Sequence, residues 1–324
     1  MATISKICCY LLILSFLEDF IYLLSMLKVG IISYGERIQE QIAILSELNC
    51  FEIVGVLPTT PLPDNSVISS DLLIEEFDVL CNKTDALFLF SSKAYYYEEI
   101  AYMIKKAKAI YIKKTGHLEV HQLKSLAALA LESNCKVMVG NYMLYRELSS
   151  LLFEQTTTPK LIEAQLAYPL VETPRFNITL SQLLYTELAF LIRLAKGDPA
   201  KVRATGCTTI SANKVDVIIA RIDFNNGATV NIHASILPFE TERTIKIYQP
   251  DSVIYADYIC NSINHLFPTK QTKNLSDQSK ARAKEYQAFY DFCNNNTTEV
   301  HSLNEDILIW EITNQLDQKV QLFT

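Results

Sequence analysis

The stretch Lys28–Arg37, read K-V-G-I-I-S-Y-G-E-R, constrains the fold most strongly. A short apolar run ends there in a turn of small residues, and apolar residues then recur at helical spacing, at Ile38, Ile42, Leu45 and Leu48. A strand, a tight turn and a helix in this order open a mononucleotide-binding βαβ unit. The start of such a helix offers free backbone N–H groups and a positive dipole end, which suit a pyrophosphate.

The turn carries only part of the glycine pattern of a dinucleotide-binding loop. Gly35 stands at the second of the three glycine positions, whereas Ser33 occupies the first and Ile38 the third. By local pattern alone, a strand-to-helix turn without a ligand fits this stretch about as well as a phosphate-binding turn.

Strands and helices alternate as far as residue 140. Apolar runs predict strands over 51–57, 85–90, 109–112 and 136–139, and helical spacing predicts helices over 71–80, 94–108 and 118–132. This order predicts a doubly wound parallel sheet, which binds ligands at the carboxyl ends of its strands. The residues that follow each strand are therefore the candidates for a binding site.

From about residue 160 the pattern changes to an α+β arrangement. Strands are expected over 160–168, 201–205, 215–224, 228–236, 244–248 and 253–258, and helices over 180–195, 276–293 and 304–320. Asn225-Asn226-Gly227 forms a hairpin turn between two of these strands. The second half therefore predicts a mostly antiparallel sheet, and the chain divides into domains over 27–150 and 151–324.

The net charge and the cysteine spacing argue against a nucleic-acid-binding protein and against a metal site. The net charge is −7 and no long basic run is present, so the sequence gives no electrostatic support for binding nucleic acid. The eight cysteines form no C-x-x-C pair and no metal-ligand spacing, which predicts reduced thiols, a cytoplasmic protein and no metal site.

Residues 1–26 differ from the rest of the chain. Two apolar runs are interrupted by Glu18-Asp19, where the middle of a membrane span would lie, and no signal-peptide cleavage site follows. Met26 lies directly before the first predicted strand, so an upstream extension of the reading frame is the preferred explanation. A membrane anchor is the alternative.

The order of segments resembles the Gfo/Idh/MocA family of oxidoreductases from about Lys28 to the C-terminus. The segments that resemble the family are Lys28–Arg37, Asp85–Glu98, Ile110–Thr115, Val137–Tyr142, the stretch L-I-R-L-A-K-G-D-P and the hairpin Ile222–Val230. The resemblance implies an N-terminal Rossmann domain and a C-terminal α+β domain whose sheet often mediates oligomers in relatives.

The resemblance also implies a chemistry and a set of site residues. It implies NAD or NADP as cofactor and hydride transfer at a hydroxyl-bearing carbon of a small sugar- or cyclitol-like substrate. Lys114 falls at the family's catalytic lysine and Glu187 at its usual histidine, as a substitute base or a counter-ion of Lys114. The implied cofactor contacts are Ser33, Tyr34, Gly35, Glu36, Arg37, Thr59, Ser91, Ser92 and Lys114.

Several positions depart from the family pattern. Lys113 and Thr115 replace the Glu and Pro of the Glu-Lys-Pro signature, Leu183 replaces an Asp, and Pro58 stands where an acidic residue binds the ribose. Two hypotheses therefore remain: an NAD(P)-dependent oxidoreductase that forms a homo-oligomer, or a catalytically silent relative that binds a nucleotide, a sugar or a partner protein. If neither residue has a catalytic role, Glu187 is a solvated helix residue and Lys114 is an ordinary lysine at the end of a strand.

Overall fold

The computed structural model describes residues 26–34, 38–59, 68–91, 97–116, 118–168, 180–209, 215–236, 241–269, 271–275, 280–297, 299–320 and 322–323. The predictions for residues 1–25 lie outside these ranges. The chain divides into two compact units. Unit 1 takes in residues 1–117, 126–139 and 286–300, and unit 2 takes in 118–125, 140–285 and 301–324.

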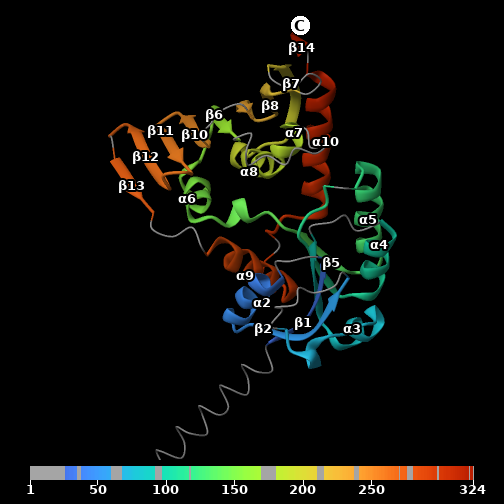
Figure 1. Cartoon of the computed structure of the whole chain (residues 1–324). Helices are drawn as coiled ribbons and strands as arrows, with labels where there is room; N and C mark the ends of the chain where they lie inside the picture. The colour runs from blue at the N-terminus through green and yellow to red at the C-terminus, as the bar shows by residue number, and fades with distance from the viewer. Residues whose placement is uncertain are drawn as a thin grey trace, which may run out of the picture. The chain divides into compact units, whose positions relative to one another are not determined.

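Unit 1 contains a five-stranded, fully parallel sheet (Figure 1). Its strand order is β2-β1-β3-β4-β5, which confirms the predicted doubly wound sheet. The strands are β1 (Leu27–Tyr34), β2 (Phe51–Pro58), β3 (Ala86–Ser91), β4 (Ala109–Ile112) and β5 (Lys136–Val139), and the helices that follow the first four are α2 (Ile38–Glu47), α3 (Phe77–Lys83), α4 (Tyr97–Lys106) and α5 (Val120–Glu132).

The predicted helix over 71–80 is wrong in its first half. A single 3₁₀ turn, η1 (Ser70–Leu72), precedes α3. Between them the backbone N–H of Ile74 donates to the carbonyl of Val56 at 2.9 Å. Because this segment pairs with β2, its amide is not available to a helical turn, and the helix begins only at Phe77.

Aromatic side chains fill the centre of unit 1. Phe88 on β3 is fully buried, and its ring centroid lies 5.0–5.3 Å from those of Tyr111, Tyr286 and Phe289. The last two come from α9 (Ala281–Cys293), which is the observed part of the helix predicted over 276–293. Buried rings in edge-to-face contact of this kind give a sheet face a dense, apolar cover.

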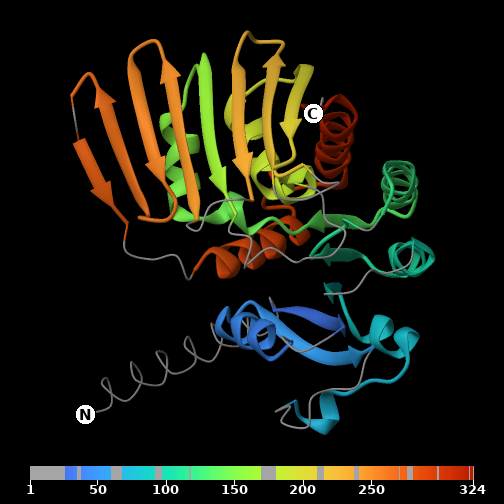
Figure 2. The same ribbon diagram turned by 45° about the horizontal axis from the view of Figure 1, so that its top comes forward.

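Unit 2 contains a nine-stranded sheet in the order β13-β12-β11-β10-β6-β9-β8-β7-β14 (Figure 2). Only the pairs β6–β9 and β7–β14 are parallel, which confirms the predicted mostly antiparallel sheet. The strands are β6 (Leu161–Ala167), β7 (Pro199–Cys207), β8 (Val217–Phe224), β9 (Thr229–Ser235), β10 (Glu242–Gln249), β11 (Ser252–Asp257), β12 (Ser262–Phe267), β13 (Gln271–Asn274) and β14 (Leu322–Phe323).

Helices cover one face of this sheet. They are η2 (Tyr142–Tyr145), α6 (Glu147–Gln155), α7 (Leu180–Leu183), α8 (Tyr185–Ala195) and α10 (Leu303–Lys319). Alternate strand residues such as Ile218, Ala220 and Ile232 are buried in one apolar core with Leu188 and Phe190 of α8. This alternation is the period-2 pattern of a sheet that packs on one face only.

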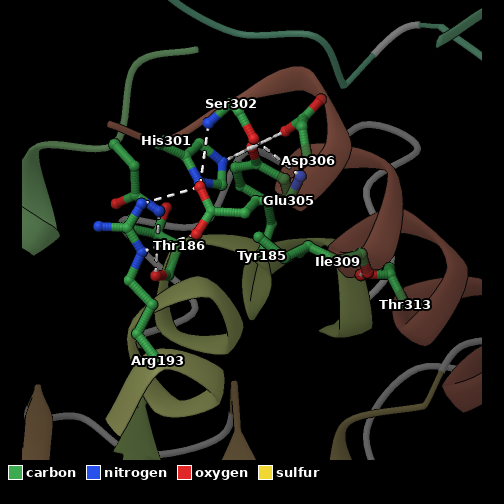
Figure 3. A network of polar contacts seen from close by, with 10 residues as sticks. Tyr185, Thr186, Arg193, His301, Ser302, Glu305, Asp306, Ile309 and Thr313 are labelled. Atoms are coloured by element: carbon green, nitrogen blue, oxygen red, sulfur yellow. Dashed lines mark hydrogen bonds and ion pairs between the residues drawn. The ribbon is translucent and has the colours of Figure 1, made fainter. Parts of the chain in front are cut away.

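A polar network joins α10 to α8 within unit 2 (Figure 3). Arg193 donates to both carboxylate oxygens of Glu305 at 2.9 and 2.8 Å, and the Tyr185 hydroxyl lies 3.1 Å from Nε2 of His301. Ser302 caps the start of α10, where its side chain and that of Glu305 form a capping box. His301 is 1% exposed because it is enclosed by this network.

Candidate functional site

The carboxyl edge of the parallel sheet carries the first group of predicted site residues. Ser33 lies near the end of β1, and its carbonyl accepts hydrogen bonds from the backbone N–H of Thr59 at 3.0 Å and from the Thr59 hydroxyl at 2.9 Å. These bonds bring together the ends of β1 and β2, two of the segments predicted to contact the cofactor. Thr59 itself is exposed at this edge.

The turn between β1 and α2 is described only at its two ends. Ser33 and Ile38, at the first and third glycine positions, are 4% and 2% exposed, so both side chains pack into the protein. Tyr34 and Ser91 end β1 and β3. The predicted contacts Gly35, Glu36, Arg37 and Ser92 lie outside the described residues.

Lys114 follows β4 at the same sheet edge. Its neighbour Lys113 continues the strand pairing, because the Lys113 backbone N–H donates to the Leu89 carbonyl at 3.1 Å. Thr115 is buried, whereas the Lys114 side chain is exposed. Unit 1 therefore presents the Lys114 ammonium to solvent at the place where a doubly wound sheet binds its ligands.

Glu187, in the first turn of α8, is the central buried charge of unit 2. Its residue is 2% exposed, and its carboxylate lies 2.5 Å from a guanidinium nitrogen of Arg243 near the start of β10. The alternative that Glu187 is a solvated helix residue is therefore wrong. Glu187 and Lys114 belong to different units, and the partner that the structure gives Glu187 is Arg243.

Polar side chains surround this ion pair. The hydroxyls of Tyr142 and Tyr168 lie beside Arg243, and Tyr168 also lies beside Glu187. Arg146 donates to the Tyr258 carbonyl at 3.1 Å, and its guanidinium lies 4.9 Å from the centre of the Tyr258 ring. We call these six residues, 142, 146, 168, 187, 243 and 258, the arginine cluster.

Burial and charge shift the pKa values in the arginine cluster in opposite directions. Burial raises the pKa of the Glu187 carboxyl, against the attraction of Arg243, which lowers it. Burial would lower the pKa of the Arg243 guanidinium, but Glu187 raises it above its ordinary value. Burial lowers the pKa of Arg146, and the nearby Arg243 lowers it further. A carboxylate with a raised pKa is better suited to accept a proton than an exposed one.

Sequence reasoning missed Arg243, Arg146, Tyr168 and Tyr258, whereas Tyr142 follows the predicted strand over 136–139 and is therefore among the predicted candidates. Arg243 stands directly before the predicted strand over 244–248, and no spacing links Arg243 or Arg146 to Glu187. The antiparallel register between β10 and β6, which pairs Arg243 with Leu166, fixes the position of Arg243. No local sequence pattern records such a register.

The other histidines and acids do not form a metal centre among the described residues. No three His, Cys, Asp or Glu side chains gather there as metal ligands. His265 lies on β12, and His233 lies on the exposed side of β9. In the part of the chain that the structure describes, no helix is both long enough and apolar enough to span a bilayer.

The chain is similar to dehydrogenases of known sequence and structure, although it matches no family model. It is 21% identical over 188 residues to UDP-N-acetylglucosamine 3-dehydrogenase of Acidithiobacillus ferrooxidans, a match that spans 58% of this chain and 60% of the relative. The crystal structure of that dehydrogenase, GnnA, aligns with a TM-score of 0.76 at 18% identity over 91% of this chain and 98% of its own.

Two further crystal structures share the architecture. The dehydrogenase MviM from Clostridium difficile aligns with a TM-score of 0.76 at 19% identity, over 91% of this chain and 99% of its own. GenD2 from gentamicin A biosynthesis, solved in complex with NAD, aligns with a TM-score of 0.70 at 13% identity, over 91% and 95%. The chain thus has the fold of the Gfo/Idh/MocA-type dehydrogenases, as its resemblance to that family predicts.

Proposed function

We propose that the chain is an NAD(P)-dependent oxidoreductase that acts on a small polyhydroxylated, sugar- or cyclitol-like substrate. The observation that carries this proposal is a buried carboxylate, Glu187, at the position of the family's catalytic histidine, on a fold shared with dehydrogenases. The NAD bound to GenD2 supports a nicotinamide cofactor. The proposal covers both NAD and NADP, because Pro58 stands where relatives carry the ribose-binding acid and no carboxylate there repels a 2′-phosphate.

The described residues fit such a cofactor at the carboxyl edge of unit 1. Ser33 and Ile38 pack inward, so neither side chain projects from the turn, and the first turn of α2 offers backbone N–H groups to a pyrophosphate. In the proposal, residues 33–37, Thr59, Ser91 and Ser92 hold the dinucleotide. When bound, the nicotinamide supplies the hydride acceptor.

The resemblance to the family implies two residues for the proposed proton transfer. The Glu187 carboxylate takes the proton of the substrate hydroxyl, which its raised pKa favours. Lys114, at the family's catalytic lysine, is the cation proposed to stabilise the negative charge that develops on the substrate. Arg243 orients the Glu187 carboxylate through the 2.5 Å ion pair.

Activity on a panel of sugars tests this proposal. The protein is mixed with NAD or NADP and each sugar, and reduced nicotinamide is followed by its absorbance. Turnover is expected, and Glu187→Gln and Lys114→Ala should each lower kcat/KM by about 10²–10⁴-fold. Lys105→Ala, an exposed lysine on α4, is the matched control and should leave turnover unchanged. Turnover that is equal in all four proteins would refute the assigned roles.

A silent relative is the second candidate function. Two observations support it. Arg243 forms an ion pair with Glu187, which neutralises the carboxylate, and the Lys114 side chain is exposed to solvent, so burial does not activate it. Saturable binding of reduced dinucleotide without turnover on any sugar would favour this candidate.

We also propose that the chain forms a homo-oligomer through the open face of the unit 2 sheet. This face holds a hollow of about 530 Å³ over β6 to β9, lined by residues of both charge signs, among them Glu163, Arg203 and Arg221. Ile219, 58% exposed, adds an apolar contact there. Ile219→Glu should lower the molar mass measured by light scattering, and an unchanged mass would oppose this interface.

A reducing compartment, the cytoplasm, is the proposed location. Every cysteine among the described residues is free. Free thiols are ordinary in a reducing environment.

A further inference from the structure

The arginine cluster holds more positive than negative charge among the described residues. Arg146 and Arg243 act on one another, and the acid that the structure places against them is Glu187. The neighbouring Arg282 lies 5.4 Å from the centre of the Tyr142 ring and 3.8 Å from Glu285, so this second ion pair adds no net charge.

Burial makes this imbalance costly. The Arg146 residue is 9% exposed and the Arg243 side chain 18% exposed. A guanidinium removed from water without a counter-charge loses hydration free energy that no nearby charge offsets. Burial and repulsion by Arg243 both lower the pKa of Arg146, as expected for two cations in one poorly hydrated region. A second anion in contact with the cluster would remove the excess charge.

Arg243 is able to bind such an anion without leaving Glu187. A guanidinium has five N–H donors in a fixed plane, and Glu187 lies against one of its two terminal nitrogens. The partial exposure of the Arg243 side chain leaves a path from solvent. Planar pairing of a guanidinium with carboxylate or phosphate oxygens is among the strongest charge-assisted contacts in proteins.

We propose that Arg243, supported by Arg146, makes the substrate site selective for a sugar that carries an anionic group, either a carboxylate or a phosphate. This inference rests on the proposed function, because it assigns Glu187 and its surroundings to the substrate. Arg243 is thus a specificity-determining residue that also positions Glu187, and the substrate is an acidic sugar rather than a neutral one.

Binding of three matched sugars tests the inference without any cofactor. D-glucuronate carries a carboxylate, D-glucose 6-phosphate carries a phosphate, and D-glucose carries neither. Calorimetric titration of the full-length protein should give at least one acidic sugar an affinity about tenfold or more above that of glucose. The acidic sugar that binds more tightly identifies the anionic group.

Two variants test the role of Arg243 without leaving the Glu187 carboxylate buried and unpaired, which could unfold the protein. Arg243→Lys keeps the charge that Glu187 needs but loses the planar fork, and the double variant Glu187→Gln/Arg243→Gln removes both charges together. Each should reduce the preference for the acidic sugar over glucose about tenfold. Lys319→Gln, which removes an exposed cation at the end of α10, should leave the preference intact.

Equal affinity for the three sugars, no measurable binding of any, or an acidic preference that survives in both Arg243 variants would overturn the inference. The proposed function fails separately. Selective binding of an acidic sugar by a protein without redox turnover would sustain this inference and refute only the oxidoreductase assignment.

Discussion

The carboxylate of Glu187 lies 2.5 Å from the guanidinium of Arg243, inside a unit that leaves the glutamate residue 2% exposed. One charge comes from the first turn of α8 and the other from the start of β10. The pair therefore links a helix to the sheet that it covers. Its stability depends on both members, because a buried charge without its partner is much more costly than a buried pair.

Removing one member of this pair should destabilise the protein strongly. Arg243→Leu leaves Glu187 buried without its cation, and we expect the free energy of unfolding to fall by about 3–5 kcal/mol. Urea denaturation followed by circular dichroism measures this change. The double variant Glu187→Leu/Arg243→Leu should recover most of the loss. Arg203→Leu, which breaks an exposed ion pair with Asp223, should cost no more than about 1 kcal/mol. Equal losses for Arg243→Leu and Arg203→Leu would show that burial does not govern the pair.

The cap of α10 should contribute measurably to stability. The Ser302 side chain accepts a hydrogen bond from the Glu305 backbone N–H at 3.3 Å, and the Glu305 carboxylate accepts one from the Ser302 backbone N–H at 3.0 Å. Ser302→Ala should lower the free energy of unfolding by about 1 kcal/mol. Ser125→Ala, on the exposed side of α5, is the control and should be neutral or slightly stabilising. A cost for Ser302→Ala no larger than that of the control would contradict the capping role.

Glu305 should make the protein sensitive to acid. Burial alone would raise the pKa of its carboxyl, but Arg193 and the Ser302 backbone hold this pKa below its ordinary value. A carboxyl whose folded pKa is lowered stabilises the fold above its unfolded pKa and loses that contribution as pH falls through the folded pKa. Melting temperatures measured from neutral pH to about pH 3 should therefore fall less steeply in Glu305→Gln than in the wild type. Parallel curves would contradict this assignment.

The buried Cys135 thiol and the half-buried Cys293 thiol should resist alkylation in the folded protein. Burial raises the pKa of Cys135 to about 12 and that of Cys293 to about 12, so little thiolate exists at neutral pH. Cys260 is exposed and should react with iodoacetamide first. Peptide mass spectrometry after brief labelling measures the order, and labelling in urea should bring the three rates together. Labelling of Cys135 as fast as that of Cys260 in the native protein would contradict the burial.

The sequence predicts the strands of unit 1 well because their apolar runs are short, continuous and separated by helical patterns. The predicted strands over 109–112 and 136–139 coincide with β4 and β5, and the hairpin at residues 225–227 connects β8 to β9. The Asn226 side chain donates to the carbonyls of Ala195 and Lys196 at the end of α8, which explains why this turn is fixed in place.

Strands and contacts that depend on distant partners could not be predicted in this way. β12 and β13 have little apolar alternation, and their strand structure depends on their partners, because β12 pairs with β11 and β13 pairs with β12. The helix predicted over 180–195 is interrupted at Leu184, between α7 and α8, where no Gly or Pro marks a break. Arg243 approaches Glu187 only through the register of β10, and His301 is buried only because α10 packs near α8.

The most direct test of the central claim is a titration of the protein with NADH and with NADPH, followed by energy transfer from Trp310 and the tyrosines to the nicotinamide. The account predicts saturable binding of at least one of the two cofactors at micromolar concentration, and competition by the corresponding oxidised form. Absence of saturable binding of both at millimolar concentration would contradict a dinucleotide site at the carboxyl edge of the parallel sheet.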